Sequence, residues 1–166
     1  MFNKSCGLFL LLIALSGIGS LQAISPLQKS PKDTIIIQSS PKTYIPFTFF
    51  QKPVLQVIND KLNIAVTDRT GDMIQVNGID ITTLQKGLLP KSAYRVVYIS
   101  QKRGTASDDA DANSMSMLEF TQCTGNKTGS AITLGLKATV TTKGKSYRIY
   151  ATLSGIIPSY SYHTTN

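Results

Sequence analysis

The sequence predicts an all-β domain, an antiparallel β-sandwich of immunoglobulin-like type, with a small β-barrel as the alternative architecture. Three observations support this prediction. Apolar and polar residues alternate over several segments, which is the period of a strand that lies with one face on a core. Turn-forming residues recur at short intervals between those segments. After the N-terminal apolar run, no segment of useful length has the apolar spacing of an amphipathic helix.

The first 23 residues have the three-part pattern of a secretory signal peptide. Lys4 supplies a positive charge, an apolar run follows over residues 7–16, and small and polar residues lead to Ala23. The apolar run is shorter than a bilayer span, which needs about 20 residues. We therefore expect export and cleavage after Ala23, and an uncleaved N-terminal anchor is the alternative.

Cleavage at this position would remove Cys6 and leave Cys123 as the only cysteine. A single cysteine cannot form a disulfide within the chain. Burial and strand pairing must then hold the domain together, even in an oxidising compartment. We expect Cys123 to act as a small buried apolar side chain rather than as a reactive thiol.

The charged residues are unbalanced but scattered. Seventeen Lys and Arg stand against nine Asp and Glu, for a formal net charge of +8. Lys102 and Arg103 form the only adjacent basic pair. Proteins that bind nucleic acid concentrate their basic residues in a stripe or patch. We therefore expect no nucleic-acid partner, and we expect the lysines to keep the protein soluble and its sheet edges apart.

Residues 24–42 are predicted to form an extended leader, because they contain three prolines and several serines and lysines. Within the leader, a short run of β-prone residues lies between Pro31 and Pro41. The run has two interpretations. It is either an ordinary first strand of its own domain or a strand that is donated to a neighbouring subunit by strand addition. The candidate subunit-polymerisation strand consists of Thr34, Ile35, Ile36 and Ile37.

The sandwich domain is predicted over residues 43–157, with a flexible tail over residues 158–166. The clearest alternation is in residues 131–140, where every even-numbered position is apolar and the odd-numbered ones are small or polar. Further strands are expected near residues 43–50, 54–58, 61–67, 73–76, 79–84, 93–100, 115–122 and 147–153.

Three short segments are predicted to reverse the chain. Residues 69–72 and residues 142–145 each contain a glycine between polar residues. Residues 77–78, Asn-Gly, are the dipeptide that accepts positive φ at both central positions of a two-residue hairpin. Pro46 and Pro53 remove ladder donors, so their segments are expected to be edge or bent strands.

Residues 104–113 are predicted to form an exposed loop. Residues 109–113 present alternating oxygen ligands, as at the start of a calcium-binding loop. The later positions do not fit, since Ser114 stands where glycine is needed and Phe120 stands where a bidentate glutamate is needed. We therefore expect no metal site.

The residues needed for general catalysis are scarce. His163 is the only histidine and lies in the predicted tail, and Glu119 is the only glutamate and lies in a predicted strand. A Ser-His-Asp device needs an imidazole that is held rigidly between two partners. No glycine-rich phosphate loop is present. We therefore expect neither an enzyme nor a cofactor.

Asn126 begins a formal glycosylation sequon, Asn-Lys-Thr.

One segment, residues 62–78, has an apolar alternating strand, an Asp-x-Thr-Gly turn that begins at Asp68, a second short strand and a glycine. This segment resembles the mid-domain of type 1-like chaperone–usher fimbrial subunits. The similarity continues through residues 94–99 and residues 117–120. The chain departs from the family because its mature part lacks the early cysteine pair and because it continues well beyond Gln122.

The resemblance implies a fimbrial (pilus) subunit or surface adhesin that assembles by strand exchange. It also implies other pilus subunits, a periplasmic chaperone and an outer-membrane usher as partners. The protein would then be secreted through the inner membrane to a fimbrium, the cell surface or the periplasm. The alternatives are a free periplasmic or extracellular β-sandwich binding module and, after it, a small secreted enzyme or inhibitor.

Overall fold

The computed structural model describes residues 32–108 and 116–159, which form an all-β fold. Within these ranges there is no α-helix, and the eleven strands belong to one antiparallel sheet that is not closed into a barrel. The expected all-β class is confirmed, and the barrel alternative is wrong. The strands are β1 (Thr34–Ser40), β2 (Thr43–Ile45), β3 (Val54–Ile58), β4 (Lys61–Thr67), β5 (Met73–Asp80), β6 (Gly87–Leu89), β7 (Arg95–Ser100), β8 (Gly104–Ser107), β9 (Met117–Cys123), β10 (Ala131–Thr142) and β11 (Lys145–Ile156).

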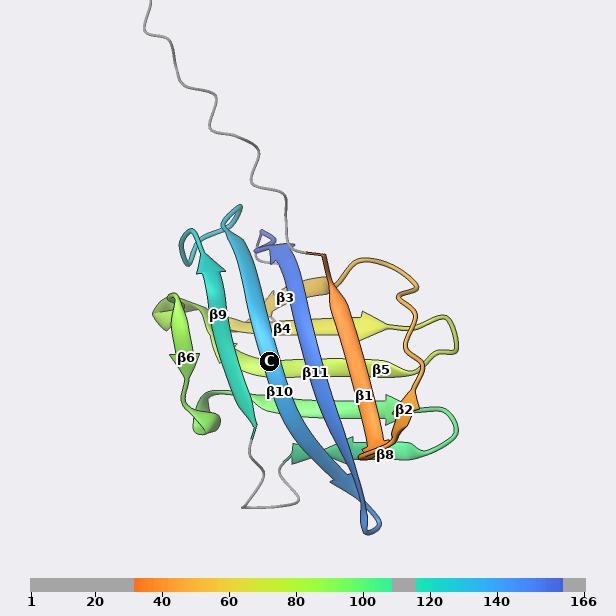
Figure 1. The fold of residues 1–166 in the computed structure, drawn as a ribbon. Helices are drawn as coiled ribbons and strands as arrows, with labels where there is room; N and C mark the ends of the chain where they lie inside the picture. The colour runs from red at the N-terminus through yellow and green to blue at the C-terminus, as the bar shows by residue number, and fades with distance from the viewer. Residues whose placement is uncertain (1–31, 109–115, 160–166) are drawn as a thin grey trace, which may run out of the picture.

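The sheet is folded over into two layers (Figure 1). The front layer holds β6, β9, β10, β11, β1 and β2, and its long strands run across those of the rear layer, which holds β8, β7, β5, β4 and β3. The far end of β10 connects the layers, where Thr141 pairs with Ser107 of β8. The sheet path ends at β3, which pairs only with β4 among the described strands. The other end of the path is β2, and because β2 and β3 do not pair, the described sheet is not closed into a barrel.

The core fills the space between the layers, and the alternation in the sequence accounts for it. In β4, Leu62, Ile64 and Val66 are at most 1% exposed, and the residues between them are partly exposed. The rings of Tyr98 (β7) and Tyr147 (β11) meet edge to face between the layers, with centroids 5.5 Å apart. The largest fully buried side chains are Tyr98, Phe120, Ile37, Leu62, Ile64, Ile74, Ile79, Ile81, Leu118, Leu134, Ile149 and Leu153.

The predicted turns have mixed outcomes. The turn at residues 69–72 joins β4 to β5, and residues 143–144, with φ of 45° and 75°, close the β10–β11 hairpin. The hairpin expected at residues 77–78 is wrong, because β5 runs through both residues. Gly78, with φ of 86°, instead sits at an irregularity in the β4–β5 register, and its N–H donates to Asn63 Oδ1. The glycine conformation thus serves a β-bulge.

Several predicted boundaries also change. Residues 34–40 form β1 of the main sheet, so the sheet begins before residue 43, where the sequence placed it. Residues 104–107 form β8 rather than the start of an exposed loop, because each pairs with β7. Residues 79–84 do not form a separate strand: β5 ends at Asp80, and a short 3-10 turn, η1 (Ile81–Thr83), follows.

The signal peptide, residues 24–31 of the leader, residues 109–115 and His163 lie outside the described residues. Across residues 32–108 and 116–159, no helix has the length and apolar character needed to cross a membrane.

Candidate functional site

The candidate polymerisation strand lies within the sheet of its own chain. β1 pairs antiparallel with β11 through five register pairs, from Thr34 opposite Thr152 to Gln38 opposite Arg148. On its other side it pairs with the three-residue strand β2. The hairpin of β1 and β2 therefore joins the rest of the sheet through one ladder, the one on β11.

The four predicted residues divide between two faces. Ile37 is fully buried in the core, and Ile35 packs against the core from a partly buried position. Thr34 and Ile36 point outward, and Ile36 is 49% exposed. Since alternate side chains of a strand serve opposite faces, β1 supplies both a core residue and an outer surface.

The entry to β1 is anchored by a polar contact. Asp33 Oδ1 accepts a hydrogen bond from the backbone N–H of Ser154 in β11 at 2.7 Å. In β2, Ile45 adds a second buried apolar side chain to the hairpin. The hairpin is thus held by one ladder, one carboxylate contact and a small apolar face.

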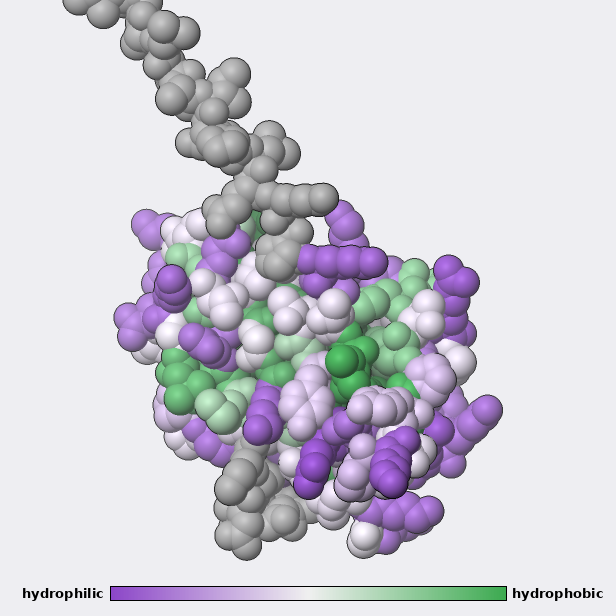
Figure 2. Space-filling model, viewed as in Figure 1, coloured by the Kyte–Doolittle hydropathy of each residue, from purple (hydrophilic) through white to green (hydrophobic). Residues whose placement is uncertain are grey.

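The outer face of the front layer contains a shallow groove of about 360 Å³ (Figure 2). Five residues cross it in register on β1, β11, β10, β9 and β6: Thr34, Thr152, Gly135, Glu119 and Leu88. Gly135 deepens its middle, since a Cβ there would meet nothing within 4 Å. Figure 2 shows apolar surface over β6 and over the β1–β11 region, with polar surface between them.

The rims of the groove are apolar and its middle is charged. Ile36, Leu88 and Met117 are 49%, 60% and 50% exposed. Lys137 and Glu119 lie between them on neighbouring strands, with Lys137 opposite Met117 and Glu119 opposite Gly135. The sequence does not reveal this face, because β1 and β6 are far in the chain from β9, β10 and β11 and join them only in the folded sheet.

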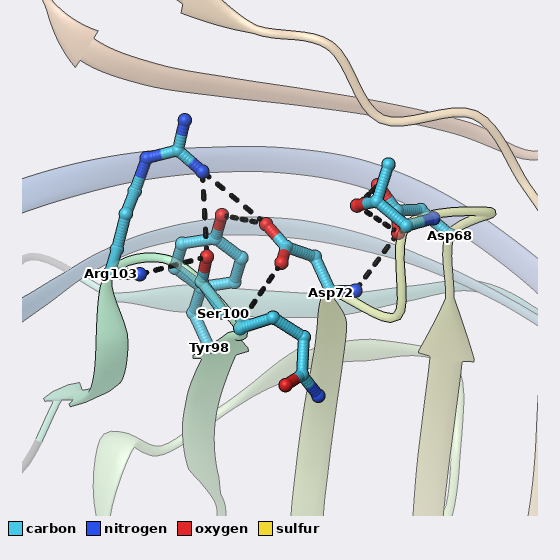
Figure 3. A network of polar contacts seen from close by, with 7 residues as sticks. Asp68, Asp72, Tyr98, Ser100 and Arg103 are labelled. Carbon is cyan, nitrogen blue, oxygen red and sulfur yellow. Dashed lines mark hydrogen bonds and ion pairs between the residues drawn. The ribbon is translucent and has the colours of Figure 1, made fainter.

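The Asp-x-Thr-Gly turn between β4 and β5 is fixed by buried carboxylates (Figure 3). Asp68 Oδ1 accepts from the backbone N–H groups of Thr70 and Asp72 at 2.7 and 2.9 Å, and the Thr70 hydroxyl donates to the same carboxylate. The side chains of Asp68 and Thr70 thereby supply the partners that the tight turn needs.

The second carboxylate of this turn connects it to β7. Asp72 Oδ2 accepts from the Tyr98 hydroxyl at 2.7 Å and contacts Arg103 at 3.4 Å, and Asp72 Oδ1 accepts from the backbone N–H of Gln101. Burial, and then the hydrogen bond to Asp72, raise the pKa of Tyr98 to about 12. These contacts join the β4–β5 turn to β7 and stabilise this end of the rear layer.

A third buried carboxylate, that of Asp108, lies at the end of β8. Asp108 accepts from the backbone N–H of Val96 at 2.9 Å, and Lys91 Nζ lies 2.9 Å from its other oxygen. The Lys91 ammonium also makes a cation–π contact with the Tyr94 ring, 5.2 Å from the ring centroid. Burial, and then the nearby Asp108 charge, raise the pKa of Tyr94 to about 12. The contacts of Asp108 with Lys91 and Val96 hold the segment between β6 and β7 against the end of β8.

The remaining candidates from the sequence do not come together. Cys123 is partly buried and its thiol contacts the Gly125 carbonyl oxygen at 3.2 Å. Asn126 lies on the surface, where its side-chain amide donates to the Thr82 carbonyl. Glu119 lies in the groove without an acidic neighbour among its lining residues. Within the described ranges, no three His, Cys, Asp or Glu residues gather as a metal site would require.

Comparison with known proteins gave no relative: no family model, no curated protein and no solved structure matches the chain.

Proposed function

We propose that this protein is an exported, non-catalytic subunit of a fimbrial or adhesive surface assembly, and that subunits exchange their first strand. The observation that supports the proposal is the attachment of the β1–β2 hairpin through a single ladder on β11. A neighbour's hairpin could form the same five register pairs and fill the same position of Ile37. Strand addition of this kind combines main-chain hydrogen bonds with pockets for alternate side chains.

The partners follow from the same mechanism. Loss of the hairpin would uncover the edge of β11 and the core position of Ile37, and uncovered apolar edges aggregate. A subunit of this kind needs a protecting partner before assembly, which in the resembled family is a periplasmic chaperone acting with an outer-membrane usher. The finer fold assignment, an immunoglobulin-like sandwich, belongs to this proposal. The two layers agree with a sandwich, whereas the crossing of their strands differs from the aligned packing of immunoglobulin-like domains.

The experiment uses the processed chain with a protease site inserted between Gln51 and Lys52, which are both exposed. After folding and cleavage, fragment 24–51 stays attached without a covalent link. A labelled peptide of residues 32–51 is then added. We expect it to replace the fragment, because both make the same ladder.

The matched control is the same peptide with Ile37→Asp. A buried unpaired charge and the lost apolar contact should weaken its incorporation by at least about 100-fold. A fragment that never exchanges, in a protein that stays monomeric on size-exclusion chromatography, would contradict strand exchange.

The groove on the front layer favours a second candidate, a free periplasmic or extracellular binding module. Its apolar rims and its Lys137 and Glu119 side chains offer a surface for another protein without any strand exchange. A processed chain that remains monomeric and keeps its own hairpin would support this candidate.

A further inference from the structure

The free edge of the rear layer is β3, a five-residue strand that is preceded by Pro53 and otherwise lacks the features that usually prevent edge pairing. Its sequence, Val-Leu-Gln-Val-Ile, contains no charge and no internal proline. Val54 and Ile58 are 39% and 41% exposed. Natural proteins usually protect such an edge with charge, bulges or a covering segment. A hollow of about 500 Å³, lined in part by Leu55 and by the 64%-exposed Ile156, lies next to the strand, and no described strand pairs with the outer edge of β3.

The geometry of the β3–β4 hairpin identifies the unpaired backbone groups. Asn59 and Asp60 have φ of 48° and 60°, so they form a two-residue turn of the type with two positive φ angles. Ile58 and Lys61 close this turn as a hydrogen-bonded pair. The pairing alternates along an antiparallel ladder, so the N–H and C=O groups of Leu55 and Val57 point away from β4.

We propose that β3 is a self-pairing edge, on which two copies of this chain associate antiparallel about a two-fold axis at Gln56. In this register the partner's Gln56 lies opposite Gln56, and the partner's Val57 lies opposite Leu55. The outward backbone groups of Leu55 and Val57 then form four interchain hydrogen bonds, and the two rear layers become one continuous sheet.

The strand is suited to this arrangement because its order of apolar and polar residues is the same in both chain directions. A two-fold interface must be self-complementary, and two apolar residues flank Gln56 on each side. Val54 meets the partner's Ile58, so the exposed apolar side chains cover one another. At each end, Lys52 lies beside the turn that carries the partner's Asp60, which gives two charge-complementary contacts.

Disulfide trapping tests both the pairing and its register, in the processed chain with Cys123→Ser. Gln56→Cys places two thiols across a non-hydrogen-bonded pair, where the Cα atoms are about 4.5 Å apart and a disulfide can form. Val54→Cys on the same strand places its two copies about 13 Å apart along the sheet. We expect a covalent dimer from Gln56→Cys and none from Val54→Cys. No cross-linking, or equal cross-linking of both variants, would overturn the proposal.

Sedimentation of the processed chain measures the interface without a disulfide. We expect a dimer whose association constant falls more than tenfold in the V54K/I58K variant. In that variant the lysine at position 54 of one chain would face the lysine at position 58 of the other across the two-fold axis. The matched control, Leu88→Lys on the other layer, should leave the dimer intact. A monomeric wild-type chain, as when another segment covers β3, would overturn the proposal. This test distinguishes β3 pairing from strand exchange through β1, because assemblies formed by strand exchange should not change in the V54K/I58K variant.

Discussion

β11 pairs with two strands that are held very differently. On one side, β10 is joined to it by a tight turn and by twelve register pairs from Ala131–Ile156 to Thr142–Lys145. On the other side, β1 has five register pairs and reaches β11 from the opposite end of the chain. Both strands bury apolar side chains in the same core. The difference shows that two strands of one core can be attached very differently: β10 is secured by local connectivity and deep burial, and β1 by fewer contacts.

The largest effect should come from the β10 side of this comparison. Leu134 is 1% exposed at the centre of the β10–β11 pair. Leu134→Ala should lower the free energy of unfolding by about 2–5 kcal/mol, through lost burial and the cavity left behind. Chemical denaturation measures this, with Leu88→Ala as the exposed control. A change below about 1 kcal/mol would mean that β10 is not part of the stable core.

Hydrogen exchange should separate the two neighbours of β11 directly. We expect the β1 amides that face β11 to exchange about 10–100 times faster than those of β10, because a hairpin held by one ladder can open without global unfolding. Mass spectrometry after proteolysis resolves the two segments. Equal protection would place β1 in the same cooperative unit as β10 and would remove the structural basis of strand exchange.

The smallest effect should be confined to alkaline pH and to the rear layer. The folded pKa of Tyr98 is raised to about 12 from an ordinary value of 10. Its contribution to stability is therefore complete below pH 10 and is lost as the pH rises from 10 to 12. We expect the melting temperature to fall over this window. Tyr98→Phe should reduce the slope, leaving the part due to Tyr94. An unchanged slope would contradict the buried Tyr98–Asp72 contact.

The sequence allowed the strands with strict alternation to be located, because each such pattern depends only on its own segment. It did not reveal the Gly78 bulge, since Asn-Gly tolerates positive φ equally well in a hairpin and in a bulge. It also did not reveal β8, whose Gly-Thr-Ala-Ser sequence has no apolar pattern and is a strand because β7 pairs with it. The groove and the β1–β11 ladder depend on contacts between distant segments. No local pattern encodes such contacts.

The contact between Asp33 and Ser154 joins residues 121 positions apart. During synthesis β1 emerges first and β11 last, so nearly the whole domain must follow β1 before its ladder partner exists. Contacts of such long sequence separation form slowly and leave apolar strands uncovered meanwhile. The order of synthesis itself therefore creates an interval in which β1 has no β11 of its own chain to pair with and is accessible to another chain.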